Sequence, residues 1–482
     1  MKKGIFFFLA ASLLIRSAVA SANSSNVTND MVAVIDSLKN EVKMMHQIID
    51  EQGRRIRQLE SASTTASALS DEGVQKSFKK TLGEVTPWLK GLKQSGDFRL
   101  RMENFEYYDK NNDAGSTGTA ADRTRNRFRV RLRWGLEKDF GDDWKTGFRL
   151  STGNTTDPTT ANQTLGNSGY FTFKNVLIDR AYASYEPSAL KDAGVIQGVK
   201  IAAGKTDNPF FRYSTPMTWD ADVSPEGVYE QVKLLFFSDQ KTKVEFQSTL
   251  GQFILNENTG TETDAQLYGY QGALAVTTWA FGTVKPISFA SAVSYYDYPN
   301  WFQTVTSNTA ATSFLRTNSI VADNFRVLDI YPEIGFELWN KPFTLWADYA
   351  TNLANTGTDD IVQSGGNDIH DADDAWGAGL KIGKVVKKGS WETSYSYYTI
   401  GANALVAAFN EAAFGGPGGA GGTNRKGHKL TFGYQVTDNM VLNWTGYVVR
   451  PLNPFNGNST IGIQNSTNET IFRSQLDVVY KF

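Results

Sequence analysis

Segments of about ten residues in which apolar and polar side chains alternate follow one another from residue 95 to the end of the chain. A period of two is that of a β-strand with one apolar face, and a long series of such strands is typical of a membrane β-barrel. Sixteen segments predict strands at residues 96–108, 125–138, 143–152, 174–186, 198–206, 228–238, 242–255, 265–280, 287–298, 324–339, 342–352, 375–384, 390–400, 427–436, 439–450 and 471–482. The predicted fold class is therefore all-β, a transmembrane antiparallel β-barrel of about 16 strands over residues 95–482.

The links between these segments alternate in length. Links after odd-numbered segments are long and rich in Gly, Asn and Thr, as at 153–173, 299–321, 351–374, 401–426 and 451–470. Links after even-numbered segments are mostly tight, as at 140–143, 238–241, 339–341 and 436–439. Outer-membrane barrels have long external loops and short periplasmic turns, and an even strand number leaves both ends of the sheet in the periplasm.

Aromatic side chains near the short links predict a girdle at the membrane interface. They are Trp144, Trp279, Phe281, Trp339, Phe343 and Trp391. The last segment places Leu476, Val478, Tyr480 and Phe482 on one face and Gln475, Asp477 and Lys481 on the other. A lipid-facing aromatic residue at the carboxyl end resembles the membrane-insertion signal of bacterial outer-membrane proteins. A soluble β-sandwich is the alternative, but it should not sustain regular long and short links over sixteen strands.

The first residues predict a signal peptide at 1–20. Lys2 and Lys3 form a basic start, residues 4–15 are apolar, and Ala18 and Ala20 form an A-x-A cleavage site. A second A-x-A at 20–22 would shift the cleavage site by two residues. A buried core helix is the alternative interpretation of the apolar segment. No later apolar run has the roughly 20 residues that a membrane helix needs. We therefore expect export, with the barrel in the bacterial outer membrane and the N-terminal segment in the periplasm.

A heptad repeat follows the signal peptide. Its a positions are Ile35, Val42, Ile49 and Ile56, and its d positions are Leu38, Met45, Gln52 and Leu59. The repeat predicts a short α-helical coiled coil at 24–62 that self-associates or packs on another part of the protein, because an isolated helix of this length cannot bury the seam. β-branched residues at a with Leu at d favour two strands. A single amphipathic helix is the alternative, and residues 63–94 are predicted to be a linker with a short helix.

The composition excludes several functions. The chain has 48 basic and 50 acidic residues and a net charge of -2, so the overall charge does not point to nucleic acid. It has no cysteine, which removes thiol nucleophiles, cysteine zinc sites and covalent haem attachment. His46, His370 and His428 are far apart in the sequence, and the acidic stretch at 109–113 matches no complete calcium loop. The acidic stretch at 368–374 could bind a divalent ion, but its composition favours a solvated loop. No metal, no cofactor and no enzyme activity are therefore expected, although a haem partner inside the barrel is left open.

Several short motifs point to a family. They are Trp88-Leu89-Lys90, the Gly96 to Arg101 run GDFRLR, the basic strand at Arg127, Asp179-Arg180-Ala181-Tyr182, Gly204-Lys205 and Asn208-Pro209-Phe210. Over roughly residues 88–482 they resemble the bacterial putative-porin family. The resemblance implies a trimeric, water-filled channel whose third external loop folds inward. A trimer disagrees with the two-stranded preference of the heptads, so the oligomer number stays open.

A row of arginines predicts what the inside of the barrel carries. Arginine occupies every second position from 127 to 133 and alternates with Phe, Val, Leu and Trp. Each arginine would cost about 2 to 4 kcal/mol on the lipid face at mid-bilayer, so this face should point into the lumen. With neighbouring strands it forms a basic wall of Arg99, Arg101, Arg127, Arg129, Arg131, Arg133, Arg149, Arg180 and Lys200. A structural face paired with carboxylates such as Glu103 is the alternative.

The link at 206–227 lies where the resemblance places the inward loop. It carries Asp207, Arg212, Asp220, Asp222 and Glu226. Acidic groups there, opposite the basic wall, would set a transverse field at a constriction, whereas an ordinary external loop is the alternative. We expect a porin for small hydrophilic solutes and ions with a mild anion preference. An envelope tether that contacts the cell wall through the coiled coil is the competing interpretation.

Overall fold

The computed structural model describes two compact units of the chain, residues 1–87 and 88–482. The described residues are 40, 43, 44, 47, 50–55, 90–109, 123–155, 157–167, 169–211, 215–258, 263–279, 285–301, 325–354, 373–415, 422–453 and 469–482. In the first unit every described residue is helical, and Arg55 lies 3.3 Å from Glu51 one turn earlier. The predicted signal peptide, nearly all of the heptad seam and most of the linker at 63–94 lie outside the described residues, so the coiled coil stays a prediction.

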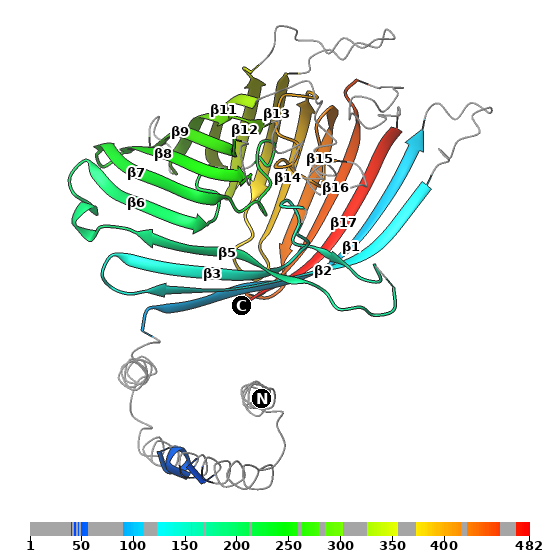
Figure 1. Ribbon diagram of the computed structural model, residues 1–482. Helices are drawn as coiled ribbons and strands as arrows, with labels where there is room; N and C mark the ends of the chain where they lie inside the picture. Colours follow the sequence, from blue (N-terminus) through cyan, green and yellow to red (C-terminus); the bar gives the residue numbers. More distant parts are fainter. Residues whose placement is uncertain are drawn as a thin grey trace. The chain divides into compact units, whose positions relative to one another are not determined.

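The second unit is an antiparallel sheet. Its strands are β1 (Leu92–Asp109), β2 (Arg123–Asp139), β3 (Trp144–Thr152), β4 (Gln163–Thr164), β5 (Val176–Tyr185), β6 (Ile196–Lys205), β7 (Glu226–Ser238), β8 (Thr242–Asn256), β9 (Ala265–Thr278), β10 (Ile287–Tyr298), β11 (Phe325–Leu338), β12 (Lys341–Asn352), β13 (Asp374–Gly383), β14 (Trp391–Ile400), β15 (Arg425–Gln435), β16 (Met440–Pro451) and β17 (Glu469–Lys481). In the part of the chain that is described, sixteen of these strands pair in chain order and β1 pairs with both β2 and β17, which closes the sheet into a barrel (Figure 1).

The sixteen predicted segments are all strands, and the prediction of an all-β antiparallel barrel is confirmed. The largest difference in a strand boundary is at β1, which begins at Leu92 rather than at residue 96. The sequence pattern did not indicate β4, a two-residue strand that pairs with Arg129 and Val130 of β2. Among the described residues no helix is long and apolar enough to cross a membrane.

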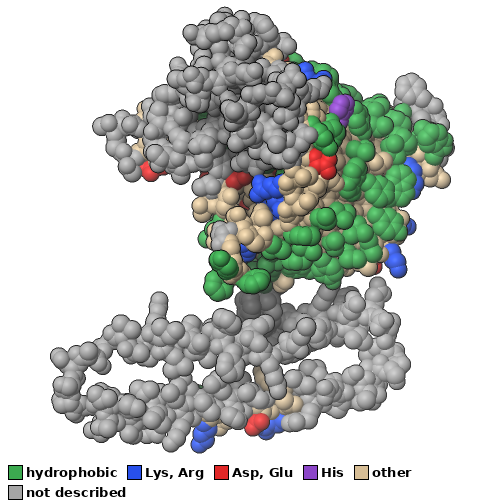
Figure 2. All heavy atoms as spheres, turned by 90° about the vertical axis from the view of Figure 1, so that its right-hand side faces the viewer, with side chains coloured by type: hydrophobic (Ala, Val, Ile, Leu, Met, Phe, Trp, Pro, Cys, Tyr) green, Lys and Arg blue, Asp and Glu red, His purple; other side chains and the backbone are tan. Residues whose placement is uncertain are grey.

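The apolar face of the sheet points outward. On β1 and β2 the side chains of Phe98, Leu100, Met102 and Phe128 are exposed. Glu103, which follows Met102 and lies on the opposite face of β1, is fully buried. Figure 2 shows how hydrophobic side chains cover the outer surface of the barrel on one side. An exposed apolar cover with charges inside is the reverse of a soluble sheet and is what a lipid environment requires.

The last strand follows the same alternation. The predicted insertion-signal residues all lie on the outer face and are 36 to 48% exposed: Leu476, Val478, Tyr480 and Phe482. Gln475 and Asp477 are buried on the inner face. Strand β17 pairs with β1 through Asp477 and Arg101, so the closure of the barrel places a carboxylate beside an arginine. A role in membrane insertion stays a prediction.

Three links turn into the barrel and fill part of it. Their buried residues belong to 153–164, 206–225 and 401–415. Trp219 of the second link stacks on Phe409 of the third with ring centroids 5.4 Å apart, and the amide nitrogen of Asp220 donates to the carbonyl oxygen of Phe409 at 2.6 Å. Strand side chains of β6 to β14, and Tyr447 and Val449 of β16, complete this apolar core. From the sequence, 153–173 and 401–426 were predicted only as long external links, because neither shows the alternation of a strand.

One close approach explains a glycine in this core. The ring of Phe210 lies over Gly269 of β9, where a Cβ atom would be 2.0 Å from the Cζ atom of the ring. Phe210 also packs edge-on against Tyr296, with centroids 5.0 Å apart. The inward loop can therefore lie against the barrel wall because the wall has no side chain at this position.

Candidate functional site

The arginines at 99, 101, 127, 129, 131 and 133 lie together on the inner faces of β1 and β2. The strand register sets Arg99 opposite Arg131 and Arg101 opposite Arg129. Like charges directly opposite one another destabilise a sheet unless counter-charges lie close by. The same register sets Asp97 opposite Arg133 and Glu103 opposite Arg127, so carboxylates flank the two arginine pairs.

These carboxylates bind the arginines closely. Asp97 accepts hydrogen bonds from the Nε atoms of Arg131 at 2.9 Å and Arg133 at 2.7 Å. Asp477 of β17 accepts two from Arg101, each at 2.7 Å. Glu103 binds Arg127 on one side and the Nε atom of Arg473 at 2.8 Å on the other. Much of the charge is therefore paired within the wall, as buried charge requires.

The three remaining residues of the predicted wall lie further along the sheet. Arg149 of β3 is paired with Asp179 at 2.5 Å, and Lys200 of β6 lies 3.9 Å from Glu186. Arg180 of β5 is opposite Arg149 in the register, and its buried Nε atom has no hydrogen-bond partner among the described residues. None of these three lines the cavity described below, so the structure does not bring the nine predicted residues into one site.

The predicted constriction residues also separate. Asp222 contacts the wall directly, 3.2 Å from an Nη1 atom of Arg133 and 3.8 Å from one of Arg131. Glu226, the first residue of β7, instead pairs with Lys205 at 2.5 Å. Asp207 is half-buried near the start of the link, and Arg212 lies outside the described residues. We expected several acidic residues on one side of an open constriction, but only Asp222 of the described loop residues forms an ion pair with the basic wall.

Asp220 and Asp222 have opposite electrostatic surroundings. Burial acts against the charge of Asp222, but Arg131, Arg133 and Arg99 outweigh it and hold the pKa of Asp222 below its usual range. Burial, and then the charge of Asp222, raise the pKa of Asp220 well above its usual range. Asp220 also receives a hydrogen bond at 3.4 Å from the amide of Ala412 in the third inward link. Asp222 thus belongs to the wall, and Asp220 to the junction of two loops.

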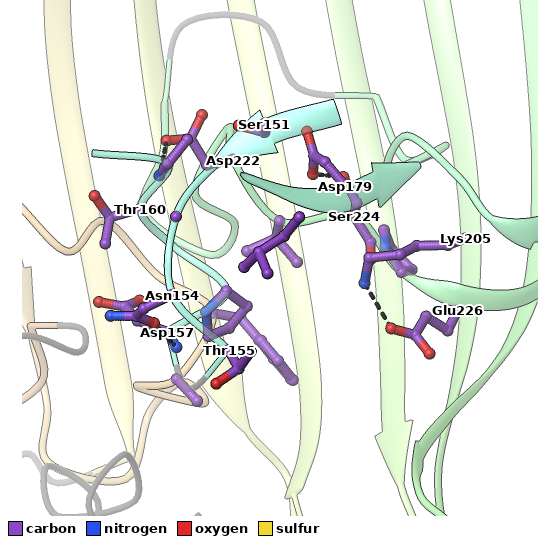
Figure 3. Close-up of a pocket in the computed structure, with 18 of the residues that line it drawn as sticks. Ser151, Asn154, Thr155, Asp157, Thr160, Asp179, Lys205, Asp222, Ser224 and Glu226 are labelled. Atoms are coloured by element: carbon purple, nitrogen blue, oxygen red, sulfur yellow. Dashed lines mark hydrogen bonds and ion pairs between the residues drawn. The ribbon is translucent and has the colours of Figure 1, made fainter. Parts of the chain in front are cut away.

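Two cavities lie beside the inward links. The first, the basic cavity, has a volume of about 870 Å³. Its ionisable lining residues are Arg99, Arg101, Arg125, Arg127, Arg129, Arg131, Lys174, Lys429 and Arg473 with Asp157, Asp220, Asp222 and Glu411. Nine basic groups thus face four acidic ones. The second cavity, of about 790 Å³, combines Trp219, Trp301 and Phe409 with polar groups. Figure 3 shows Asp179, Ser224, Lys205 and Glu226 on one side of it and Asn154, Thr155 and Asp157 on another.

Several residues of the basic cavity were not predicted from the sequence. Arg473 of β17 donates to the carbonyl oxygen of Ala413 at 2.7 Å, and Lys429 of β15 pairs with Glu411 at 2.6 Å. Arg473 lies on the inner face of the last strand, in phase with Gln475 and Asp477, so the alternation of that strand could have indicated it. Glu411 carried no such signal, since its link has no periodic pattern.

The comparison with protein families agrees with this architecture. The sequence profile of a family described as putative porin matches residues 117–321 and 303–447, which is more than half of the chain. The chain belongs to this family. As a member of the putative-porin family, it is an outer-membrane channel protein with a closed antiparallel barrel of 16 strands.

Solved structures of three porins are similar to this putative porin at low identity. OprB of Pseudomonas putida, solved at high pH, is 11% identical, with 83% of this chain and 96% of that chain covered and a TM-score of 0.47. OmpF of Salmonella typhi, in complex with daunomycin, is 12% identical over 81% and 97%, with a TM-score of 0.41. A porin of Comamonas acidovorans described as anion-selective is 11% identical over 81% and 99%, with a TM-score of 0.39. No curated protein sequence matches the chain.

Proposed function

We propose that this porin is a channel for passive diffusion of small hydrophilic solutes and ions, with a modest preference for anions. The observation that supports the preference is the lining of the basic cavity, where nine basic residues face four acidic ones. A cleft lined mainly with one sign of charge concentrates ions of the opposite sign. Guanidinium groups stay charged over the whole accessible pH range, so the preference does not depend on a titrating cation.

Two conditions should change this preference. Burial raises the pKa of Asp157, and burial together with the charge of Asp222 raises the pKa of Asp220. These two loop carboxylates therefore take up protons at a higher pH than an ordinary aspartate does. Acidification therefore removes negative charge from the cavity lining and increases anion preference. Salt weakens the anion preference, because the Debye length falls from about 10 Å at 0.1 M to about 3 Å at 1 M.

The reversal potential of the full chain in a planar bilayer under a KCl gradient tests this proposal. Replacing Arg129 and Arg131 by Gln should shift it towards cation preference, and replacing Asp220 and Asp222 by Asn should shift it towards anions. Replacing Lys387 and Lys388 by Gln removes the same number of positive charges from an exposed link and should leave the potential as it is. If neither double variant moves the reversal potential while both still conduct, these residues do not control ion passage.

A structural tether remains the second candidate because the inward links crowd one side of the barrel with apolar side chains. In that case the predicted coiled coil at 24–62 would contact the cell wall and the barrel would serve as an anchor. A full chain that inserts into bilayers but never conducts would favour the tether.

The oligomer number needs a separate measurement. Sedimentation of the full chain in detergent, compared with a chain that lacks residues 24–62, would give the oligomer number and show whether this segment contributes to it. A trimer stays a prediction from the family resemblance.

A further inference from the structure

Arg99 and Arg129, which both line the basic cavity, lack close counter-charges of their own. The Nε atoms of Arg99 and Arg129 are buried and have no hydrogen-bond partner in the described part of the chain. Arg129 is 8% exposed, and its nearest carboxylate is Glu103 at 3.9 Å, which already binds Arg127 and Arg473. Among the described residues no carboxylate lies within 4.0 Å of a side-chain nitrogen of Arg99. Both side chains line the basic cavity.

A neutral group holds the two arginines in place. The Nη2 atom of Arg99 donates to Oδ1 of Asn162 at 2.6 Å, and the Nη2 atom of Arg129 donates to the backbone oxygen of the same residue at 3.2 Å. Thr160 accepts a longer bond from Arg129 at 3.4 Å. One residue of an inward link thus orients two guanidinium groups without neutralising either of them.

The acidic residues of the cavity are engaged elsewhere. Asp222 pairs with Arg133 and Arg131, and Glu411 pairs with Lys429. The Oδ1 atom of Asp157 accepts hydrogen bonds from both the amide and the hydroxyl of Thr159. Asp220 lies at the loop junction, beside Asp222 and Glu411. The cavity therefore holds positive charge that the lining does not balance, and buried charge of this kind is costly without a partner.

We propose that Arg99 and Arg129, oriented by Asn162, form a binding site for a small oxyanion with two or more negative charges, such as a phosphate, a sulfate or a dicarboxylate. Planar guanidinium groups match the paired oxygen atoms of such anions and form short, charge-assisted hydrogen bonds with them. A chloride ion offers a single acceptor atom, whereas each of these anions offers several oxygen atoms. The site rests on the proposed anion-preferring channel and gives it a substrate class: solutes that are bound during passage as well as attracted.

Sulfate is the probe, because its charge does not change near neutral pH. In planar bilayers at constant ionic strength, exchange of chloride for sulfate should lower the single-channel current of the full chain in a saturable way. Arg99→Gln and Arg129→Gln should each raise the half-saturating sulfate concentration about tenfold, as expected for loss of a charge-assisted hydrogen bond. Arg149→Gln is the matched control. It removes one interior charge, but Arg149 is paired with Asp179 and does not line the cavity, so the sulfate response should stay unchanged.

A second measurement does not depend on conduction. In detergent, sulfate should raise the unfolding temperature of the wild-type chain more than that of Arg129→Gln, with chloride as the reference salt because sulfate also stabilises proteins generally. An equal response of the two proteins, or a current that is insensitive to sulfate in a chain that conducts and is anion-preferring, overturns the binding site and leaves the channel proposal intact. A chain that binds sulfate in detergent but does not conduct keeps the site and overturns the channel proposal.

Discussion

The inner face of the barrel differs between its two sides, although the outer face is apolar on both. On β1, β2 and β17 the inward side chains are charged, form ion pairs with one another and leave the basic cavity open. On β7 to β14 the inward side chains are largely aromatic or small, and two inward links pack against them. A membrane barrel needs only an apolar exterior, so its interior can be specialised in two ways. Here one side packs against apolar side chains of the links, and the other lines the basic cavity together with polar and acidic residues of the links.

The packed side should be the more sensitive to loss of a single side chain. Trp219 is 3% exposed and contacts Phe210, Tyr296 and Phe409. Trp219→Ala should cost about 3 to 5 kcal/mol in stability, in line with other deletions of buried aromatic residues. Release of the two links should also raise the single-channel conductance. Urea unfolding in detergent micelles gives the first effect and bilayer recording the second, and a variant with unchanged conductance would mean that the links do not limit the pore.

The charged side should be less sensitive, provided that its pairing stays intact. Glu103 is fully buried between Arg127 and Arg473, and removal of one partner of a buried ion pair typically costs about 3 kcal/mol or more. Glu103→Gln keeps the shape and some hydrogen bonds, so we expect about 2 to 3 kcal/mol, measured by the same urea unfolding. Glu226→Gln serves as the control, because the Lys205–Glu226 pair is largely exposed and should contribute less than about 1 kcal/mol. Equal effects of the two variants would contradict a structural role of the wall carboxylates.

The sequence predicted the two sides unequally well. A strand alternates its side chains between two faces, and a charged face cannot point to lipid. The sequence therefore predicted which residues of β1 and β2 point inward. The partners of the arginines were not, because Asp477 and Arg473 reach the wall only through the closure of β17 on β1. The burial of 401–415 was also missed. This segment has no strand period, and its position depends on contacts such as that of Phe409 with Trp219, which join links far apart in the sequence.

A glycine substitution distinguishes the two sides at smaller cost. Gly269→Ala places a methyl group where the Phe210 ring lies, so the ring and its link must move. Overpacking of this kind typically costs about 1 to 3 kcal/mol. Gly198→Ala on β6 is the matched control, because its Cβ would meet no atom within 4 Å and its φ is not positive. Differential scanning calorimetry of both variants gives the comparison, and an equal or larger loss in Gly198→Ala would contradict the close packing of the inward link.

The smallest effect concerns pH at the boundary between the two sides, where Asp222 joins the wall and Asp220 joins the packed links. A carboxyl group whose folded pKa is raised favours its protonated form in the folded state, so the stability that Asp220 contributes is largest in acid. This stability falls as the pH rises from the unfolded pKa through the folded one. Asp222 behaves in the opposite way. Its lowered pKa gives stability that is present above the unfolded pKa and is lost as the pH falls through the folded one.

The two windows lie on opposite sides of the ordinary aspartate pKa, near 3.8, so they can be separated in one titration. Asp220→Asn should flatten the decline of stability above that pH and leave the acid limb in place. Asp222→Asn should remove the acid limb and also weaken the decline, because the charge of Asp222 is one cause of the raised pKa of Asp220. Glu411 also faces Asp220, so Glu411→Gln should weaken the decline partly, because it removes one of the charges that disfavour ionised Asp220. Stability measured by urea unfolding at intervals across both windows decides this. If Asp220→Asn retains the wild-type decline above the ordinary pKa, the pH dependence belongs to groups outside the loop junction.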